Sequence, residues 1–377
     1  MSYRALHFPR PVLPEGATEL RAEVRAFVAG EIASGAFRPR CDNWLAGYDP
    51  DFSRRLGARG WLGMTWPKEY GGGERSALER YIVTEELLAA GAPVAAHWIA
   101  DRQTGPLLLR YGTEEQRRQF LPAMTRGELF CCIGMSEPDA GSDLASIRTS
   151  ARRVEGGWSV SGTKVWTSGA HRGHLMLSLV RTEPLGEDRH HGLSQVLIDL
   201  KAPGVQVRPI RLLTGEHHFN EVFLNDVSVP DGMLVGKLGE GWSQVVSELA
   251  FERSGPERFL STFPLLQAMV AESSLDRAVV GHLTAQLWAL RRLSLGVAAA
   301  IQEGRAPAIE AALVKDLGTR FEREVTEEAR RVPPSRRSAA YGRLLAEAEL
   351  AGPGFTLRGG TNEILRGIVA RGIAGRG

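Results

Sequence analysis

The spacing of apolar residues along this chain changes twice, and that change most limits the folds it can adopt. Up to about residue 129 the spacing is helical, as in the run from Leu20 to Val28. Between 130 and 236 the apolar residues alternate or form short β-branched runs, and from 237 the helical spacing returns. A chain of 377 residues also exceeds the roughly 250–300 residues that one core usually serves. We therefore predict an α+β multidomain protein, with an N-terminal helical domain (1–129), a middle antiparallel β domain (130–236) and a C-terminal helical bundle (237–377).

The local signals support this division. The expected strands include Trp158–Val160, Val165–Thr167, Leu175–Val180, Val196–Ile198, Val205–Val207 and Val222–Leu224. No helical pattern lies between these runs, which argues against a parallel doubly wound sheet. Ser76-x-x-Glu79 and Thr113-x-x-Gln116 are capping boxes that predict helix starts. The C-terminal helices are expected near 242–254, 258–303, 307–331, 338–350 and 361–372.

The charge balance and the cysteines exclude several classes of protein. Lys and Arg number 46 against 44 Asp and Glu, too even for a nucleic-acid reader that needs a concentrated basic surface. No apolar run is long enough to span a membrane, and the first four residues lack a secretory core, so we expect a cytoplasmic protein. Cys41 and the adjacent Cys131-Cys132 form no zinc or disulfide pattern and are interpreted as structural. A redox-active vicinal pair is the alternative, but no nearby His or Lys would lower a thiol pKa.

Two segments have residues suited to a flat, anionic cofactor. In Met135 to Asp143, which leaves a predicted strand, Gly141 allows close backbone approach while Ser136 and Ser142 supply hydrogen-bonding groups. In Gly162 to Gly169, Trp166 and Ser168 are two positions apart and would share one side of a strand. The competing interpretations are a Ser-rich surface turn for the first segment and ordinary core for the tryptophan.

Together with Gly60-Trp61-Leu62-Gly63, Trp66-Pro67-x-x-Tyr70-Gly71-Gly72 and Gly360-Thr361-Asn362-Glu363-Ile364, these segments resemble the acyl-CoA dehydrogenase family. The resemblance implies an FAD-dependent enzyme that removes two hydrogens across the α and β carbons of an acyl-CoA or acyl-carrier-protein thioester. An electron-transferring flavoprotein would accept the electrons. By resemblance the cofactor-binding residues are Met135, Ser136, Gly141, Ser142, Trp166, Ser168, Thr361 and Glu363, and the substrate-binding residues are Ser142, Arg253 and Gly360.

The position of the α-proton base separates two groups within the family. Better-known members keep a Glu immediately before the C-terminal Gly-Thr, where this chain has Gly359. Isovaleryl- and long-chain-type members place the Glu on a helix just before an Arg, which matches Glu252-Arg253. The resemblance therefore implies Glu252 as the base, with the Gly359 N–H and an FAD hydroxyl holding the thioester oxygen. Glu257, in the following Glu-Arg pair, is the next candidate, and Pro256 is expected to bend the helix near Glu252.

This chain also departs from most homotetrameric members. It lacks their Arg-x-x-Phe-Gly and Gln-x-x-Gly-Gly motifs, which reach FAD across a subunit boundary. The departure resembles a two-subunit branch known from bacterial steroid side-chain breakdown, so a homo-oligomer and an α2β2 assembly with a paralogous subunit both stay open. Arg277, Arg291 or the basic loop from Arg330 to Arg337 are alternative phosphate contacts. A flavin oxidase or monooxygenase of the same fold is the alternative function, and the sequence does not specify the acyl chain.

Overall fold

The computed structural model describes residues 6–253, 255–272 and 276–374, with the backbone alone at 248–252. Contacts within the chain divide it into two compact units. The first contains Met1–Gly47, Arg75–Pro93 and Leu249–Gly377, and the second contains Tyr48–Glu74 and Val94–Glu248. The expected helical, β and helical regions are present, which confirms the predicted fold class. The three domain boundaries stay a prediction.

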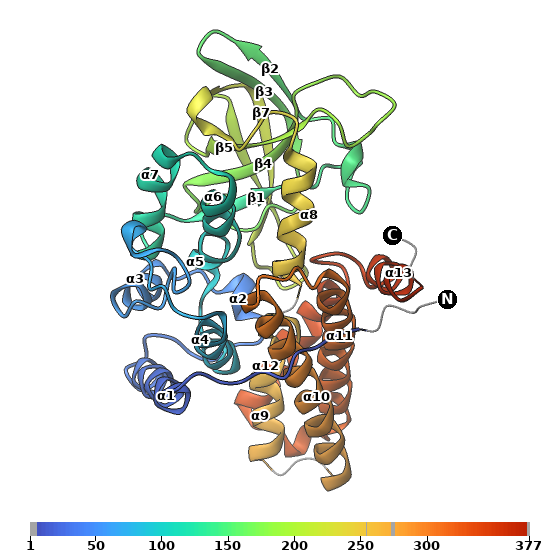
Figure 1. The fold of residues 1–377 in the computed structure, drawn as a ribbon. Helices are drawn as coiled ribbons and strands as arrows, with labels where there is room; N and C mark the ends of the chain where they lie inside the picture. Colours follow the sequence, from blue (N-terminus) through green and yellow to red (C-terminus); the bar gives the residue numbers. More distant parts are fainter. Residues whose placement is uncertain (1–5, 254, 273–275, 375–377) are drawn as a thin grey trace. The chain divides into compact units, whose positions relative to one another are not determined.

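The second unit is built around one eight-stranded sheet with the order β6-β7-β3-β2-β4-β5-β8, in which β1 pairs with β4 (Figure 1). Its strands are β1 (Cys131–Gly134), β2 (Ser150–Val154), β3 (Gly157–Lys164), β4 (Leu175–Arg181), β5 (Leu193–Asp199), β6 (Val205–Ile210), β7 (Phe219–Pro230) and β8 (Leu234–Val235). Most pairings are antiparallel, as predicted, but β1 runs parallel to β4, and β2 meets β4 in parallel at one residue pair. The sheet is therefore mixed. β1 pairs with β4, which lies three strands later in the sequence, and runs parallel to it.

Both faces of this sheet are buried around β4, which explains why this strand has no exposed residue. One face forms a cluster that includes Val160, Met176 and Val222. The other face, with Leu175, Leu177 and Leu197, packs against apolar residues of the preceding helices. These helical segments are α3 (Pro50–Ala58), η1 (Lys68–Tyr70), α5 (Ala95–Ile99), the π-helix η2 (Ala100–Thr104), α6 (Gly105–Tyr111) and α7 (Glu114–Thr125). Thr113 and Gln116 form the predicted capping box at the start of α7.

The first unit is helical. Its elements are α1 (Ala17–Ala33), α2 (Asn43–Ala46), α4 (Ala77–Ala89), η5 (Pro256–Arg258), α9 (Phe263–Ala271), α10 (Arg277–Gln302), α11 (Ala308–Arg331), η6 (Pro334–Arg336), α12 (Ala339–Phe355) and α13 (Asn362–Ile373). α10 and α11 lie side by side (Figure 1). The capping box of Ser76 and Glu79 opens α4 as predicted. α8 (Gly241–Glu252) begins in the second unit and ends in the first.

Two helix predictions were wrong. The segment 258–303 was expected as one helix, but it contains η5 and the separate helices α9 and α10. The chain was also expected to bend as a helix near Pro256, but α8 ends at Glu252 and a short 3-10 turn starts at Pro256. Proline supplies no amide donor to continue an α-helix, so the helix stops instead of kinking.

The three cysteines are buried and free, in agreement with their structural interpretation. Burial raises the pKa of each thiol, that of Cys131 to about 12. A thiol that stays protonated is a poor nucleophile, so the vicinal pair is not activated for redox chemistry. Among the described residues, no helix combines the length and the apolar character needed to cross a bilayer.

Candidate functional site

The first predicted cofactor segment is attached to the sheet through a buried ion pair. Glu137 and Lys164 are buried, with Lys164 Nζ 2.8 Å from Glu137 Oε1. The Glu137 carboxylate also accepts from the backbone N–H groups of Arg148 (2.6 Å) and Thr149 (2.9 Å). Lys164 donates a second hydrogen bond, to the carbonyl of Met135 (3.2 Å). One ion pair thus joins the segment after β1 to the end of β3 and the start of β2.

Burial is the largest influence on the pKa of Glu137 and raises it, but the charge of Lys164 and the hydrogen bonds from Thr149 and Arg148 outweigh it. The pKa of Glu137 therefore lies below its usual value. Burial lowers the pKa of Lys164 to about 8, although the charge of Glu137 opposes this shift. Both groups are charged at neutral pH, which suits an ion pair with a structural role.

The sequence analysis did not assign this pair, although a signal for it was present. Lys164 occupies an inward position of β3, in phase with the buried Val160. A lysine in an apolar register needs a buried carboxylate or another acceptor. Glu137 was quoted within the motif, but its partner follows 27 residues later, and spacing alone does not reveal such a contact.

In the same segment Met135 and Ser136 are half-buried and Ala140 is buried, whereas the end at Gly141 and Ser142 faces open space. Ser142 is exposed, and a Cβ built on Gly141 would meet no atom within 4 Å. The packing of this chain therefore does not itself require glycine at 141, which leaves close approach by a ligand as a reason for it. Asp143 fixes the end of the segment, since its carboxylate pairs with Arg189 at 2.6 Å and accepts from Ser146.

The second segment does not continue β3 as predicted. β3 ends at Lys164, and Trp166 has a φ of 60°, in the left-handed region. Trp166 and Ser168 therefore do not share one side of a strand, and that prediction was wrong. The cause is tertiary: Lys164 pairs with Val222, and Thr167 exchanges backbone hydrogen bonds with Asn220 of β7 (3.0 and 3.1 Å), so this side of the pairing has one extra residue and the chain bulges at Trp166.

The turn leaves the indole of Trp166 on the surface. The residue is 56% exposed, which excludes the alternative of an ordinary core tryptophan. Its ring contacts Phe219 edge to face, with centroids 5.8 Å apart. An exposed indole has a face available for a flat ring system to stack on. Ser168 is half-buried in the same turn, and Val165 N–H donates to the Ser136 carbonyl (2.9 Å), so the two predicted segments lie together.

Asn220 and two histidines support this turn, and the sequence analysis did not single them out. The Asn220 amide donates to the Thr167 carbonyl (3.0 Å) and lies 3.2 Å from His171 Nδ1. His217 Nε2 donates to Asn220 Oδ1 (2.6 Å), and the two imidazoles stack 4.0 Å apart. Burial and the neighbouring His217 lower the pKa of His171 to about 4, so it is neutral at pH 7 and accepts from Asn220.

The first unit contains the residues expected at the substrate end. Glu252 is the last residue of α8, but its side chain lies outside the described residues. Arg253 is buried, and its Nε donates to the Gly359 carbonyl (3.2 Å). The structure thus brings together two of the predicted positions, Arg253 and the Gly359 turn. It also shows that Glu257 is buried beside Arg258, 3.2 Å from its Nε, so Glu257 is not a solvated carboxylate.

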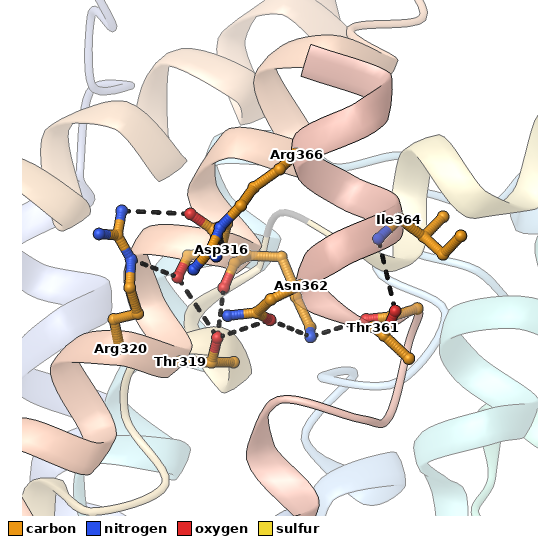
Figure 2. Close-up of polar contacts among 9 residues, drawn as sticks. Asp316, Thr319, Arg320, Thr361, Asn362, Ile364 and Arg366 are labelled. Atoms are coloured by element: carbon orange, nitrogen blue, oxygen red, sulfur yellow. Dashed lines mark hydrogen bonds and ion pairs between the residues drawn. The ribbon is translucent and has the colours of Figure 1, made fainter. Parts of the chain in front are cut away.

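Gly359 and Gly360 form a turn that requires glycine. Their φ values are 66° and 95°, and a Cβ on Gly359 would lie 2.9 Å from both terminal nitrogens of Arg258. Among the described residues no group accepts a hydrogen bond from the Gly359 N–H. Thr361 then caps α13 by accepting from Ile364 N–H (3.4 Å; Figure 2), and Glu363 is exposed in the first turn of that helix.

The chain matches two family models: the acyl-CoA dehydrogenase N-terminal domain over residues 14–128 and the middle domain over 132–227. These matches cover more than half of the sequence. The chain belongs to the acyl-CoA dehydrogenase family. Members of this family are FAD-dependent oxidoreductases that dehydrogenate acyl-CoA thioesters, and this is the enzyme class of the chain. The family resemblance seen in the sequence is confirmed.

Several known members are similar over most of the chain. Acyl-CoA dehydrogenase IpdE1 of Mycobacterium tuberculosis is 34% identical over 95% of this chain and 97% of its own length. FadE34 of the same organism is 35% identical over 94% of this chain, which spans about half of FadE34. A solved structure described as the Tcur3481-Tcur3483 steroid ACAD has 29% identity and a TM-score of 0.83, covering 96% of this chain and 97% of its own. The ChsE4-ChsE5 complex of M. tuberculosis has 28% identity and a TM-score of 0.81, covering 97% and 99%.

Proposed function

We propose that this chain removes the α proton of an acyl-CoA thioester with the Glu252 carboxylate, in an α,β-dehydrogenation to the trans-2-enoyl thioester. The hydrogen bond from Arg253 to Gly359 carries the proposal, because it anchors the residue after Glu252 to the turn from which other family members take their base. A Cβ on Gly359 would lie 2.9 Å from both terminal nitrogens of Arg258, which would have to shift, and the φ of 66° also disfavours a side chain there. A carboxylate from the end of α8 is then the available base near this turn.

The second unit fits the cofactor of the family. Bound FAD supplies the chemistry of accepting the hydride from the β carbon. The exposed indole of Trp166 offers a stacking face, Ser136 and Ser168 offer hydroxyls, and the open space beside Gly141 admits a ligand. Met135 and Ser142 are proposed contacts of the same cofactor, as are Thr361 and Glu363 in the first unit. Ser142 and Gly360 are also proposed to contact the substrate.

The Gly359 turn supplies a candidate donor to the thioester oxygen. Proton removal places negative charge on that oxygen, and a fixed N–H group stabilises it without moving. We propose the Gly359 N–H for this role, because no acceptor among the described residues uses it. Arg253 orients the turn through the Gly359 carbonyl, which makes it an anchor of the site.

Anaerobic bleaching of the flavin tests the base. Glu252→Gln should retain FAD but slow bleaching by about 10²–10⁴-fold, the usual contribution of a positioned general base. Glu115→Gln, an exposed carboxylate change on α7, is the matched control and should behave as wild type. Near-normal bleaching by Glu252→Gln would move the base elsewhere, with Glu257 the next residue to replace. The thioester panel should include polycyclic chains, because one similar structure is described as a steroid ACAD.

We further propose that a paralogous subunit completes the FAD site, and that an electron-transferring flavoprotein accepts the electrons. Two of the arginines expected as alternative phosphate contacts form ion pairs within this chain: Arg291 with Glu85 (2.6 Å) and Arg330 with Glu349 (3.0 Å). Two similar structures are described by pairs of protein names, which supports a two-subunit assembly. A homodimer or homotetramer with one tightly bound FAD per chain, measured on the chain expressed alone, would refute this proposal. The cytoplasmic location stays a prediction.

A further inference from the structure

Lys315 of α11 is fully buried, and the acceptors of its hydrogen bonds in the described chain are neutral groups. Its ammonium group donates to the Gly360 carbonyl (2.8 Å) and to Asn362 Oδ1 (2.9 Å). Asn362 Oδ1 also accepts from Thr319 Oγ1 (3.2 Å; Figure 2). The ammonium thus spans the end of the Gly359–Gly360 turn and the first residue of α13.

Among the described side chains, none forms an ion pair with Lys315. Asp316 is the adjacent carboxylate, but it pairs with Arg320 (3.1 Å) and Arg366 (3.0 Å), as Figure 2 shows. Burial and the positive charges of Arg258 and Arg358 lower the pKa of Lys315 to about 7, against the opposing charges of Glu322 and Asp316. Burying a cation without a direct carboxylate partner is costly, and an apolar residue would fill the same space at lower cost. A role in the turn explains why a lysine is present.

Two basic side chains donate to consecutive carbonyls of one turn. Arg253 donates to the Gly359 carbonyl and Lys315 to the Gly360 carbonyl. Glycine at both positions makes the turn conformationally permissive, with φ values of 66° and 95°, so these contacts must select one conformation. The Gly359 N–H precedes these carbonyls and shares a peptide plane with neither, so its direction depends on the φ and ψ of Gly359, which the fixed carbonyls restrict.

We propose that Lys315 is a positioning residue for the thioester: through the Gly360 carbonyl and Asn362 it holds the Gly359 turn in the conformation that directs the Gly359 N–H at the thioester oxygen. This inference rests on the proposed function, which assigns that N–H to the oxygen. Lys315 itself contacts neither substrate nor cofactor in this role. Its contribution is to the geometry of a donor whose stabilisation depends on distance and direction.

The test compares Lys315→Met, which removes both hydrogen bonds of the lysine at similar volume, with Thr319→Val, which removes the hydroxyl that donates to Asn362 Oδ1 and to the Lys315 and Asp316 carbonyls but leaves the lysine contacts in place. Two measurements are made on FAD-loaded protein: the rate of anaerobic flavin reduction, and the infrared carbonyl stretch of the bound thioester. The probe is the fastest-bleaching acyl-CoA of the panel, labelled with ¹³C at the thioester carbonyl. A merely structural role of Lys315 would not move this stretch, because it reports polarisation of the C=O bond by its donors.

Lys315→Met should retain FAD, reduce its flavin about 10–100-fold more slowly and shift the carbonyl stretch toward the frequency in water. Thr319→Val should stay within about threefold of wild type, since the lysine contact to Gly360 is intact. An unchanged stretch in Lys315→Met, or equal slowing in both variants, would overturn the inference while the proposed function stands. If Lys315→Met does not fold, Lys315→Gln takes its place under the same criteria. Failure of every thioester to bleach wild type would overturn the proposed function and, with it, this inference.

Discussion

Replacing either member of the buried Glu137–Lys164 pair should destabilise the second unit, but by unequal amounts. Glu137→Gln leaves the ammonium of Lys164 at 0% exposure without its charge partner. Lys164→Met leaves a carboxylate that still accepts from the N–H groups of Arg148 and Thr149. We therefore expect Glu137→Gln to cost more stability than Lys164→Met.

The expected size follows from the burial of the pair. Removing one partner of a buried ion pair typically costs about 3–5 kcal/mol, because the remaining charge is uncompensated. Lys164 can relieve this cost by losing its proton. Full deprotonation at pH 7, from an ordinary pKa of about 10.4, costs about 5 kcal/mol, which limits the penalty of Glu137→Gln. The double variant Glu137→Gln/Lys164→Met has no orphaned charge, so it should lose at least about 2 kcal/mol less than the sum of the single variants.

Urea titrations followed by tryptophan fluorescence measure the four free energies of unfolding of this cycle. Arg153→Lys is a matched control, because its ion pair with Asp231 is exposed and should contribute less than about 1 kcal/mol. The reasoning would be refuted if the loss of stability in the double variant equalled the sum of the losses in the two single variants to within about 0.5 kcal/mol. They would mean that Glu137 and Lys164 contribute independently, despite their 2.8 Å contact.

Two other predictions follow from burial and exposure. Trp166→Ala should lose or reposition the flavin because its ring is exposed for stacking, whereas Ser168→Ala should keep the flavin and slow its reduction by about 10-fold, the effect of one lost hydrogen bond. Flavin content and the absorption spectrum check both, and unchanged values in the two variants would place the cofactor elsewhere. Burial raises the pKa of Glu322 to about 7. The folded protein therefore binds this proton more tightly than the unfolded chain, and the contribution of Glu322 to the free energy of unfolding is complete below about pH 4.5 and is lost as the pH rises to about 7. Glu322→Gln should remove about 3 kcal/mol of this pH dependence in urea titrations at pH 4.5–7.5, and an unchanged slope would count against a protonated Glu322.

The elements predicted successfully from the sequence are those whose determinants are local. The capping boxes at Ser76 and Thr113 form as expected, because each joins residues three positions apart. The switch from helical to β spacing near residue 130 also places β1 correctly, directly before Met135. The helix prediction from apolar spacing was wrong where a turn interrupts an apolar region, as between α9 and α10. Apolar spacing alone does not distinguish one long helix from two that bury the same kind of face.

The parts of the candidate site that sequence reasoning missed depend on distant partners. Trp166 leaves the strand conformation because Thr167 pairs with Asn220, which follows 53 residues later. Lys315 meets Asn362 across 47 residues, and its interior position was not evident in a helix that also has many exposed charges. Neither contact has a local pattern. The family resemblance identified the turns at Trp166 and Gly359, but not the residues Asn220 and Lys315 that hydrogen-bond to them.

The contact between Arg258 and Gly359 gives a physical reason for the proposed position of the base in this chain. The Arg258 guanidinium lies 2.9 Å from where a Cβ on Gly359 would be, and it contacts Glu257 at 3.2 Å and the ring of Trp44 at 5.6 Å. A glutamate at 359 would first have to displace this buried cation from a turn whose φ of 66° already disfavours a side chain. If it fitted, the adjacent guanidinium would lower the pKa of the new carboxyl, whereas a base for a weakly acidic α proton needs a raised pKa. Arg258 and a glutamate at 359 are therefore incompatible in catalysis, and the same argument favours a base on α8, at Glu252.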